Sequence, residues 1–282
     1  MKKLPLLVFI LLVSFSAMSQ SKIKGNRVVT NEEQSLDYFT KLEVNDKIKL
    51  ILKQGNQNSL EVEADENLHE VLDADVKNSV LTLSLNKRIT RSKRFSITLN
   101  VEDLDQIVLN DDCEVTAPEE LDVFNLDVIL NNKSDLVLDN LKTQFLSLET
   151  NERSKSQLRV RTDSLEINAK ESSRLKLDII TQGSSVNYSG SSLVEIEGKT
   201  SNLTLYATDN AGFKGAEFVA ENVLVSALDK SDSYVNAKET IVIEAKNKAK
   251  VYVFNKPEIN LKIFEDNASL FKRESMTLLE NL

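Results

Sequence analysis

The fold is decided by a stretch that reads Ser164-Leu165-Glu166-Ile167-Asn168-Ala169-Lys170-Glu171-Ser172-Ser173-Arg174-Leu175. It opens with a short segment in which Leu165 and Ile167 alternate with polar residues, as they do in a half-buried strand. A polar turn follows, and the small residue Ser173 then stands two places before the apolar Leu175. The stretch therefore predicts a strand, a tight turn and the start of a second strand.

The same pattern, a small residue two places before an apolar one, recurs nine times from about residue 104 onward. The pairs are Cys113 with Val115, Ser134 with Leu136, Ser156 with Leu158, Ser173 with Leu175, Ser192 with Val194, Ala211 with Phe213, Ser233 with Val235, Ala249 with Val251 and Ala268 with Leu270. Successive spacings of 21, 22, 17, 19, 19, 22, 16 and 19 residues average about 19.4. A sustained period of this length indicates a repeat architecture.

Each repeat also holds a second alternating segment, for example at 145–148, 203–206 and 241–243. We therefore predict an all-β protein that forms a single parallel β-helix, or β-solenoid, with coils of about 19 residues. Small side chains would lie where each coil turns tightly. The alternative is a β-sandwich, which also contains short strands at regular spacings.

Strand-like alternation also precedes the repeats, at 42–52, 60–64, 80–85 and 95–101. Turns are expected between these strands at 55–58 and 77–79, because Gly and Asn in these segments tolerate the positive φ angles that tight turns require. Only 65–73 looks helical, and Asp65 is placed to cap its first turn.

The N-terminus predicts export. Two lysines, an apolar run over 6–13 and small residues before Ser19 form the pattern of a signal peptide over 1–19, cleaved between Ser19 and Gln20. No later stretch is long enough to span a bilayer, so no transmembrane segment is expected after cleavage. We assign 20–35 to a flexible N-terminal segment, 36–274 to the β-helix domain and 275–282 to a C-terminal tail.

The net charge and the single cysteine limit the kinds of partner and of covalent cross-link that the chain can have. Without residues 1–19 the chain has 33 basic and 44 acidic side chains, a net charge of about −11. Nucleic acid is therefore not expected as a partner, because phosphate binding needs clustered cations. The single cysteine, Cys113, allows no internal disulfide and occupies a small-residue corner, where burial is expected. The sequence points to no cofactor.

Two groups of residues are candidates for ligand binding. A basic cluster contains Lys87, Arg88, Arg91, Lys93 and Arg94, and it could hold an anionic glycan or a lipopolysaccharide phosphate. The same cluster could instead be a charged strand edge that discourages aggregation. Tyr188 and Tyr206 precede their corner residues by four and five places, so they could stack on adjacent coils, whereas Tyr234 and Tyr252 fall outside that register.

Acidic residues offer a weaker metal hypothesis. Asp111 and Asp112 lie in the densest acidic stretch, with Asp103, Asp105 and Glu114 nearby. Calcium requires six to eight converging oxygen ligands, and adjacent coils could supply some of them. The alternative is a set of solvated turns. His69 is the sole histidine and has no partner in a recognisable catalytic motif.

The stretch 39–55, with Phe39, Leu42 and Val44, is followed by 60–68, and together they resemble the start of the putative auto-transporter adhesin, head GIN domain family. The turns at 113–115 and 134–136 are similar to those of the family, although Asn45, Asp112 and Lys133 stand where glycine is commoner. The resemblance covers about 36–274. It implies an exported, right-handed β-helical domain of a Gram-negative cell envelope, without established catalytic residues.

The sequence as a whole favours a non-enzymatic, exported binding module of the adhesin type. Expected partners are a glycan, a cell-surface protein or further copies of the chain, at the cell surface, in the periplasm or in the medium. Two alternatives stay open. One is a lyase-like enzyme that acts on polysaccharides with carboxylates near Asp111 and Asp112, and the other is a structural spacer.

Overall fold

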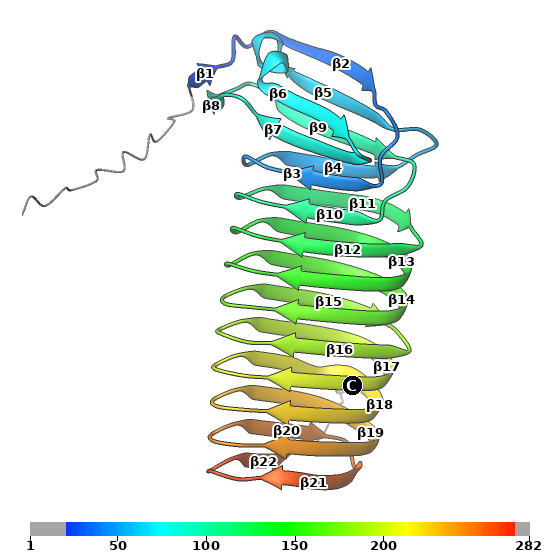
Figure 1. Cartoon of the computed structure of the whole chain (residues 1–282), viewed down its shortest axis with the longest axis vertical. Coiled ribbons are helices and arrows are strands. Elements are labelled where there is room, and N and C mark those ends of the chain that lie inside the picture. Colours follow the sequence, from blue (N-terminus) through cyan, green and yellow to red (C-terminus); the bar gives the residue numbers. More distant parts are fainter. Residues whose placement is uncertain (1–20, 274–282) are drawn as a thin grey trace, which may run out of the picture.

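A computed structural model describes residues 21–273 and shows a tall column of stacked coils beneath a small cap (Figure 1). About nine turns make up the solenoid. The elements are β1 (Lys22–Lys24), β2 (Val29–Ser35), β3 (Lys41–Val44), β4 (Lys49–Gln54), β5 (Ser59–Asp65), the 3₁₀-helix η1 (Glu66–Val71), β6 (Leu72–Lys77), β7 (Val80–Leu85), β8 (Arg88–Arg91), β9 (Phe95–Val101), β10 (Gln106–Leu109), β11 (Glu114–Asp122), β12 (Asn125–Leu130), β13 (Asp135–Thr150), β14 (Lys155–Ala169), β15 (Arg174–Ile180), β16 (Gly183–Tyr188), β17 (Leu193–Ala207), β18 (Gly212–Ala227), β19 (Asp232–Ala245), β20 (Lys250–Phe254), β21 (Glu258–Phe264) and β22 (Ser269–Lys272).

Parallel ladders between successive coils confirm the predicted β-solenoid. Leu146 of β13 lies beside Leu165 of β14, which in turn lies beside Ser184 of β16, and the pairing is parallel throughout this column. The alternative β-sandwich is not observed, because its sheets would be antiparallel and would lack this coil-to-coil register.

Small residues do line one corner of the coils, but two of the predicted members were wrong. The corner carbonyls of Cys113, Ser134, Ser154, Ser173, Ser192, Ala211, Ser231 and Ala249 each accept a hydrogen bond from the coil that follows. The last of these bonds comes from Ser269, which places Ala268 as the ninth corner of the column. Its spacings of 21, 20, 19, 19, 19, 20, 18 and 19 residues are more even than those predicted from the sequence.

The two misplaced residues, Ser156 and Ser233, occupy core positions instead of corners. Ser156 is aligned with Leu136 and Leu175, and Ser233 is aligned with Phe213 and Val251. Both pairs of neighbours carry large apolar side chains, so the two serines leave extra room inside the coil. The spacing rule chose them because each also precedes an apolar residue by two places.

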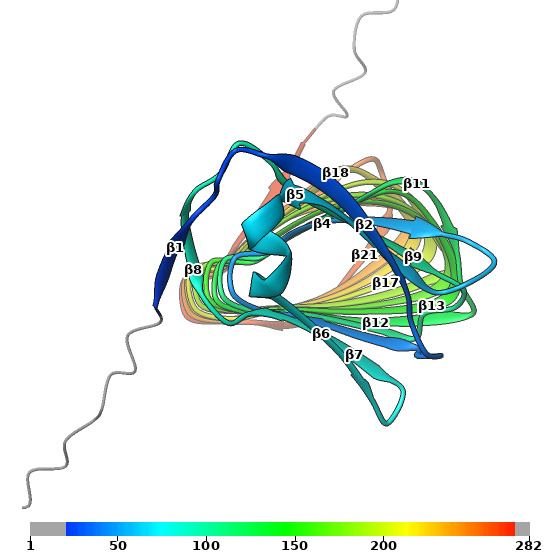
Figure 2. The same ribbon diagram turned by 90° about the horizontal axis from the view of Figure 1, so that it is seen from above.

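Most of the cap comes from 55–105, a long insertion between the first coil and the second, and β2 completes it. Strands β3 and β4 form the first coil and pair directly with β10 and β11 below. Strands β7 and β9 continue the parallel ladders above that coil, and β5, β6 and β2 then add antiparallel neighbours. Figure 2 shows these strands and η1 lying across the top of the column.

Residues 20–35 were expected to be a flexible segment, but from residue 21 onward they contain β1 and β2. Strand β2 pairs with β5 along its full length, and β1 pairs with β8 in a short parallel arm beside the cap. Their partners lie 24 to 67 residues further along the chain, so local sequence carried no sign of the pairing. No helix in residues 21–273 is long and apolar enough to cross a membrane. The predicted signal peptide and the tail from residue 274 lie outside the described residues.

Candidate functional site

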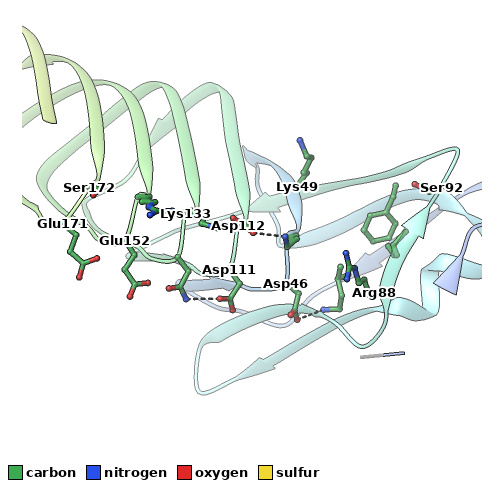
Figure 3. A pocket seen from close by; sticks show the side chains of 16 residues that line it. Asp46, Lys49, Arg88, Ser92, Asp111, Asp112, Lys133, Glu152, Glu171 and Ser172 are labelled. Atoms are coloured by element: carbon green, nitrogen blue, oxygen red, sulfur yellow. Dashed lines mark hydrogen bonds and ion pairs between the residues drawn. The ribbon is translucent and has the colours of Figure 1, made fainter. Parts of the chain in front are cut away.

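A groove of about 1110 Å³ lies between the β1–β8 arm and the narrow edge of the first coils. We call it the head groove. One wall is a column of tight turns from five coils, and the other contains Arg88, Ile89 and Ser92 from the arm and its surroundings (Figure 3). Leu85 and Phe95 add apolar surface between the walls. At this size the groove is slightly larger than the pockets of about 300–1,000 Å³ that bind small molecules.

The turn wall has a repeated backbone geometry. Paired residues with positive φ close successive coils, as in Asp111-Asp112 (58° and 61°) and Asn132-Lys133 (52° and 67°). Asp and Asn tolerate this left-handed conformation better than most residues. Hydrogen bonds stack the turns, since Asp112 N donates to Asn132 O at 2.9 Å and Lys133 N donates to Glu152 O at 3.1 Å. The turn side chains therefore project at a regular interval along the groove.

Acidic side chains of this wall are held by neighbouring coils. The Lys47 ammonium lies 2.8 Å from the Asp112 carboxylate, and this hydrogen-bonded ion pair holds the pKa of Asp112 below its ordinary value. Asp111 accepts a hydrogen bond from the Asn132 amide at 2.9 Å. Asp46 accepts one from the backbone N–H of Leu85 at 3.1 Å, which ties the turn wall to the cap.

The opposite wall is positioned by the buried carboxylate of Asp65. It accepts hydrogen bonds from the backbone N–H groups of Arg27 (3.1 Å), Lys93 (3.0 Å) and Arg94 (3.0 Å). Burial opposes ionisation, but these donors outweigh it, and the pKa of Asp65 is lowered. Asp65 was expected to cap η1, yet it makes no side-chain hydrogen bond to that helix. Instead it fastens the segments that follow β1 and β8 to the cap.

The groove lining carries balanced charge. Five cations (Lys47, Lys49, Arg88, Lys133 and Arg153) stand against five anions (Asp46, Asp111, Asp112, Glu152 and Glu171). Lys47 and Lys49 are paired with Asp112 and Glu114. Within residues 21–273, by contrast, no ion pair engages Arg88, Lys133 or Arg153. In a chain of net charge −9, the groove is thus a neutral region with three cations outside these ion pairs. The charge of one of them, Lys133, also helps to lower the pKa of Asp112.

Comparison with known proteins identifies the family. The model of the family described as putative auto-transporter adhesin, head GIN domain, matches residues 38–161 and again 152–257. The chain belongs to this family.

Solved structures share the fold of this head GIN domain. A putative adhesin from Parabacteroides merdae ATCC 43184 has a TM-score of 0.64 and 15% identity, covering 90% of this chain and 99% of its own. A putative adhesin from Parabacteroides distasonis ATCC 8503 has a TM-score of 0.64 and 14% identity, and the match covers 90% of this chain and 100% of that adhesin. A putative lipid binding protein from the same organism has a TM-score of 0.63 and 14% identity, and the match covers 90% of this chain and 100% of that protein. At these identities the similarity shows the fold alone, and the curated proteins give no match.

The predicted basic cluster does not form one site in this head GIN domain. Of its five residues only Arg88 lines the head groove. Arg94 pairs with Glu63 at 2.6 Å, and the backbone of Lys93 binds Asp65. Sequence proximity suggested a single patch, but β8 and the bend after it point successive side chains in different directions.

The two predicted tyrosines are not a stacked pair. Tyr188 is 2% exposed, and its hydroxyl lies 2.5 Å from the Ser233 hydroxyl across the core, so it is not available to a ligand. Tyr206 is 46% exposed but is aligned with Asn187. The prediction that Tyr188 binds ligand was therefore wrong, because Ser233 and Phe213 make an inward pocket for its ring.

An aromatic column was missed at the other end of the head GIN domain. Tyr234 stacks on Tyr252 with ring centroids 4.2 Å apart, and Tyr252 stacks on Phe271 at 4.8 Å. The repeat pattern in the sequence placed the corner of this coil at Ser233 instead of Ser231. With that corner, Tyr234 and Tyr252 did not fall at equivalent positions of their coils. Correctly placed, each of the three rings lies three residues after its corner residue.

The metal hypothesis gains no support from the described residues. Asp111 and Asp112 are engaged by Asn132 and Lys47. No group of three or more His, Cys, Asp or Glu residues that could hold a metal ion occurs within 21–273. Cys113 is buried, and burial raises its pKa to about 11, so its thiol is a packing group. The predicted cleavage residues Ser19 and Gln20 lie outside the described part of the chain.

Proposed function

We propose that the chain is an exported, non-enzymatic binding module of the cell surface whose ligand occupies the head groove. The family and several structural neighbours are named adhesins, which supports a surface-binding role. The groove itself carries the rest of the proposal, because it joins a row of rigid turns to an arm that bears Arg88.

The chemistry of the groove favours a surface glycan that carries carboxylate or phosphate groups. Arg88, Lys133 and Arg153 can each pair with such groups by charge-assisted hydrogen bonds. Asn132 and Ser172 add neutral donors and acceptors for hydroxyl groups. Leu85, Ile89 and Phe95 can contact the apolar faces of sugar rings. The wall of turns repeats coil by coil, which suits an extended polymer better than a small compact ligand.

The test is glycan-array binding by the full chain, followed by titration of the strongest array glycan. Reversing two groove charges, Arg88→Glu with Lys133→Glu, should weaken binding at least about tenfold, since each lost ionic hydrogen bond contributes about 1.5–3 kcal/mol. The control Lys199→Glu with Lys238→Glu makes the same change of charge at exposed sites outside the groove. Equal weakening by both pairs would mean that the groove is not the site.

The lyase-like alternative makes a different prediction. Carboxylates near Asp111 and Asp112 would have to act on the polymer, so incubation with acidic polysaccharides would release unsaturated products. We expect none. Product release that is lost on Asp111→Asn with Asp112→Asn would replace the binding proposal with an enzymatic one.

A further inference from the structure

The outer face of two coils in the middle of the column is basic. Residues 155–161 of β14 pair in parallel with the whole of β15, and in both segments exposed side chains alternate with buried ones (Figure 1). The outward side chains of these two segments share one surface, which we call the basic plate. Its members are Lys155, Gln157, Arg159, Arg161, Arg174, Lys176, Asp178 and Ile180.

The basic plate keeps a positive charge after its ion pairs are counted. It carries five cations and one anion, a sum of +4, in a chain of net charge −9. Arg159 pairs with Asp178 at 3.1 Å. Charges of the plate act on Asp135 and Glu120 in neighbouring coils only beyond ion-pair distance. Within residues 21–273 no ion pair engages the four remaining cations, Lys155, Arg161, Arg174 and Lys176.

Two of these cations are direct neighbours across the ladder. The parallel register places Lys155 beside Arg174, and Lys176 follows Arg174 by two places on the same face. Like charges at directly paired positions of a sheet destabilise it. An anionic group that lies over the two side chains removes this repulsion, so the folded coils gain from binding it.

The basic plate is a narrow strip. Along the strands it extends from Lys155 to Arg161, about 20 Å at about 3.3 Å per residue. Across the strands it is two coils wide, with about 4.8 Å between neighbouring strands. On the same face, the coils above and below each carry two carboxylates and one lysine, a sum of −1: Asp135, Asp139 and Lys142 in β13, and Glu195, Glu197 and Lys199 in β17. The positive strip is thus bounded on both sides by negative coils.

From this geometry we infer that the basic plate binds a linear anionic polysaccharide, laid along β14 and β15. Lys and Arg pair with carboxylate groups by charge-assisted hydrogen bonds. A polymer with carboxylates along its chain meets cations at successive positions of the strip, from Lys155 and Arg174 at one end to Arg161 at the other. The plate is a second site, and the inference does not depend on the ligand of the head groove.

Other polyanions fit the basic plate less well. An anionic lipid surface is a plane, so it would also meet the carboxylates of Asp139 and Glu197 beside the strip. Single-stranded nucleic acid is held largely by aromatic side chains that stack on its bases, and the plate contains no aromatic residue. A linear polyuronate presents its charges along one narrow chain, which matches the strip.

The inference is tested by titrating the full chain with polygalacturonate and with the same polymer after complete methyl esterification. The charged polymer should bind, more weakly as the salt concentration rises, and the esterified polymer should not. The plate variant Arg174→Glu with Lys176→Glu should weaken binding at least about tenfold, because carboxylates replace two cations of the strip. The control Lys238→Glu with Lys256→Glu makes the same charge change at exposed sites outside the plate and the head groove. It should stay within about twofold of the original chain, because distant charges are screened.

Two further measurements guard against a misfolded variant. Arg174→Glu places a carboxylate beside Lys155, so the urea midpoint of the plate variant should equal or exceed that of the original chain. On the original chain, carbodiimide should couple the carboxylates of a short oligogalacturonate to the amines of Lys155 and Lys176, which mass spectrometry locates.

Several results would overturn the inference. They are absence of polygalacturonate binding, equal binding of the esterified polymer, equal loss in the plate and control variants, and coupling confined to lysines outside the plate. Tighter binding of oligothymidylate or of phosphatidylglycerol vesicles than of polygalacturonate would replace the polysaccharide by nucleic acid or by lipid.

Discussion

Gly198 in β17 offers the sharpest test of the coil register. Its φ of 113° lies in a region that residues with a Cβ rarely adopt. A Cβ built at this position would lie 2.0 Å from the carbonyl oxygen of Ile179 in the coil above, far inside van der Waals contact. The neighbour is backbone within a parallel ladder, so it cannot move aside as a flexible side chain could.

The cost of Gly198→Ala has two parts. Backbone strain at a positive φ of this kind costs about 1–3 kcal/mol, and overpacking against a fixed neighbour costs about 1–3 kcal/mol more. The free energy of unfolding should therefore fall by about 2–6 kcal/mol. With a urea dependence of about 3 kcal/mol per M, the midpoint should fall by about 0.7–2 M.

Gly183→Ala supplies the matched control, because it makes the same chemical change in β16. A Cβ at Gly183 meets nothing within 4 Å, and its φ is not in the positive region. Its midpoint should stay the same or rise slightly, since alanine restricts the unfolded chain more than glycine does. Both variants would be unfolded in urea and followed by far-ultraviolet circular dichroism. Equal midpoints for the two would refute the register on which the coil packing rests.

Three further predictions concern buried groups. Tyr188→Phe and Ser233→Ala should each lower the free energy of unfolding by about 1–3 kcal/mol, because each leaves one buried hydroxyl without its partner; a double variant that costs as much as the two single costs added together would rule out the pair. The lowered pKa of Asp65 stabilises the fold above the pKa of the unfolded chain, about 3.9, and this contribution is lost as the pH falls through the lower folded value. The urea midpoints of the original chain and of Asp65→Asn should therefore converge at low pH. A difference between the midpoints that does not change with pH would contradict this. Cys113, with a pKa of about 11, should react with a maleimide at neutral pH only after unfolding, and labelling of the folded chain at the rate of a free thiol would show that the corner is open.

The column was predictable from sequence because each coil repeats the same packing problem. Inward Leu, Val and Ile, a small corner residue and an αL-tolerant turn recur every coil, so many independent positions report one architecture. Errors arose where a residue fitted the pattern by chance. Ser156 and Ser233 are small and precede an apolar residue, but only the hydrogen bonds between coils distinguish them from the corners at Ser154 and Ser231.

The head groove could not be predicted in the same way. Its walls come from β8 and from turns of five successive coils, and the insertion at 55–105 brings them together. The basic cluster around Arg88 was visible in the sequence. Asp65, whose carboxylate holds the backbone of Lys93 and Arg94, was interpreted as a local helix cap. The arm depends on pairing between β1 and β8, whose aligned residues lie more than 60 positions apart. Long-range pairing of single short strands leaves no periodic trace.

The most direct test of the proposed function is a footprint of the bound ligand by amide hydrogen exchange. The full chain would be saturated with the strongest glycan from the array, and exchange would be compared with that of the unbound chain. Slower exchange should appear in 85–95 and in the turns at 110–113, 131–134 and 151–154, and not in the coils beyond residue 220. Protection confined to other coils, or absent from both groove walls, would contradict a ligand site in the head groove.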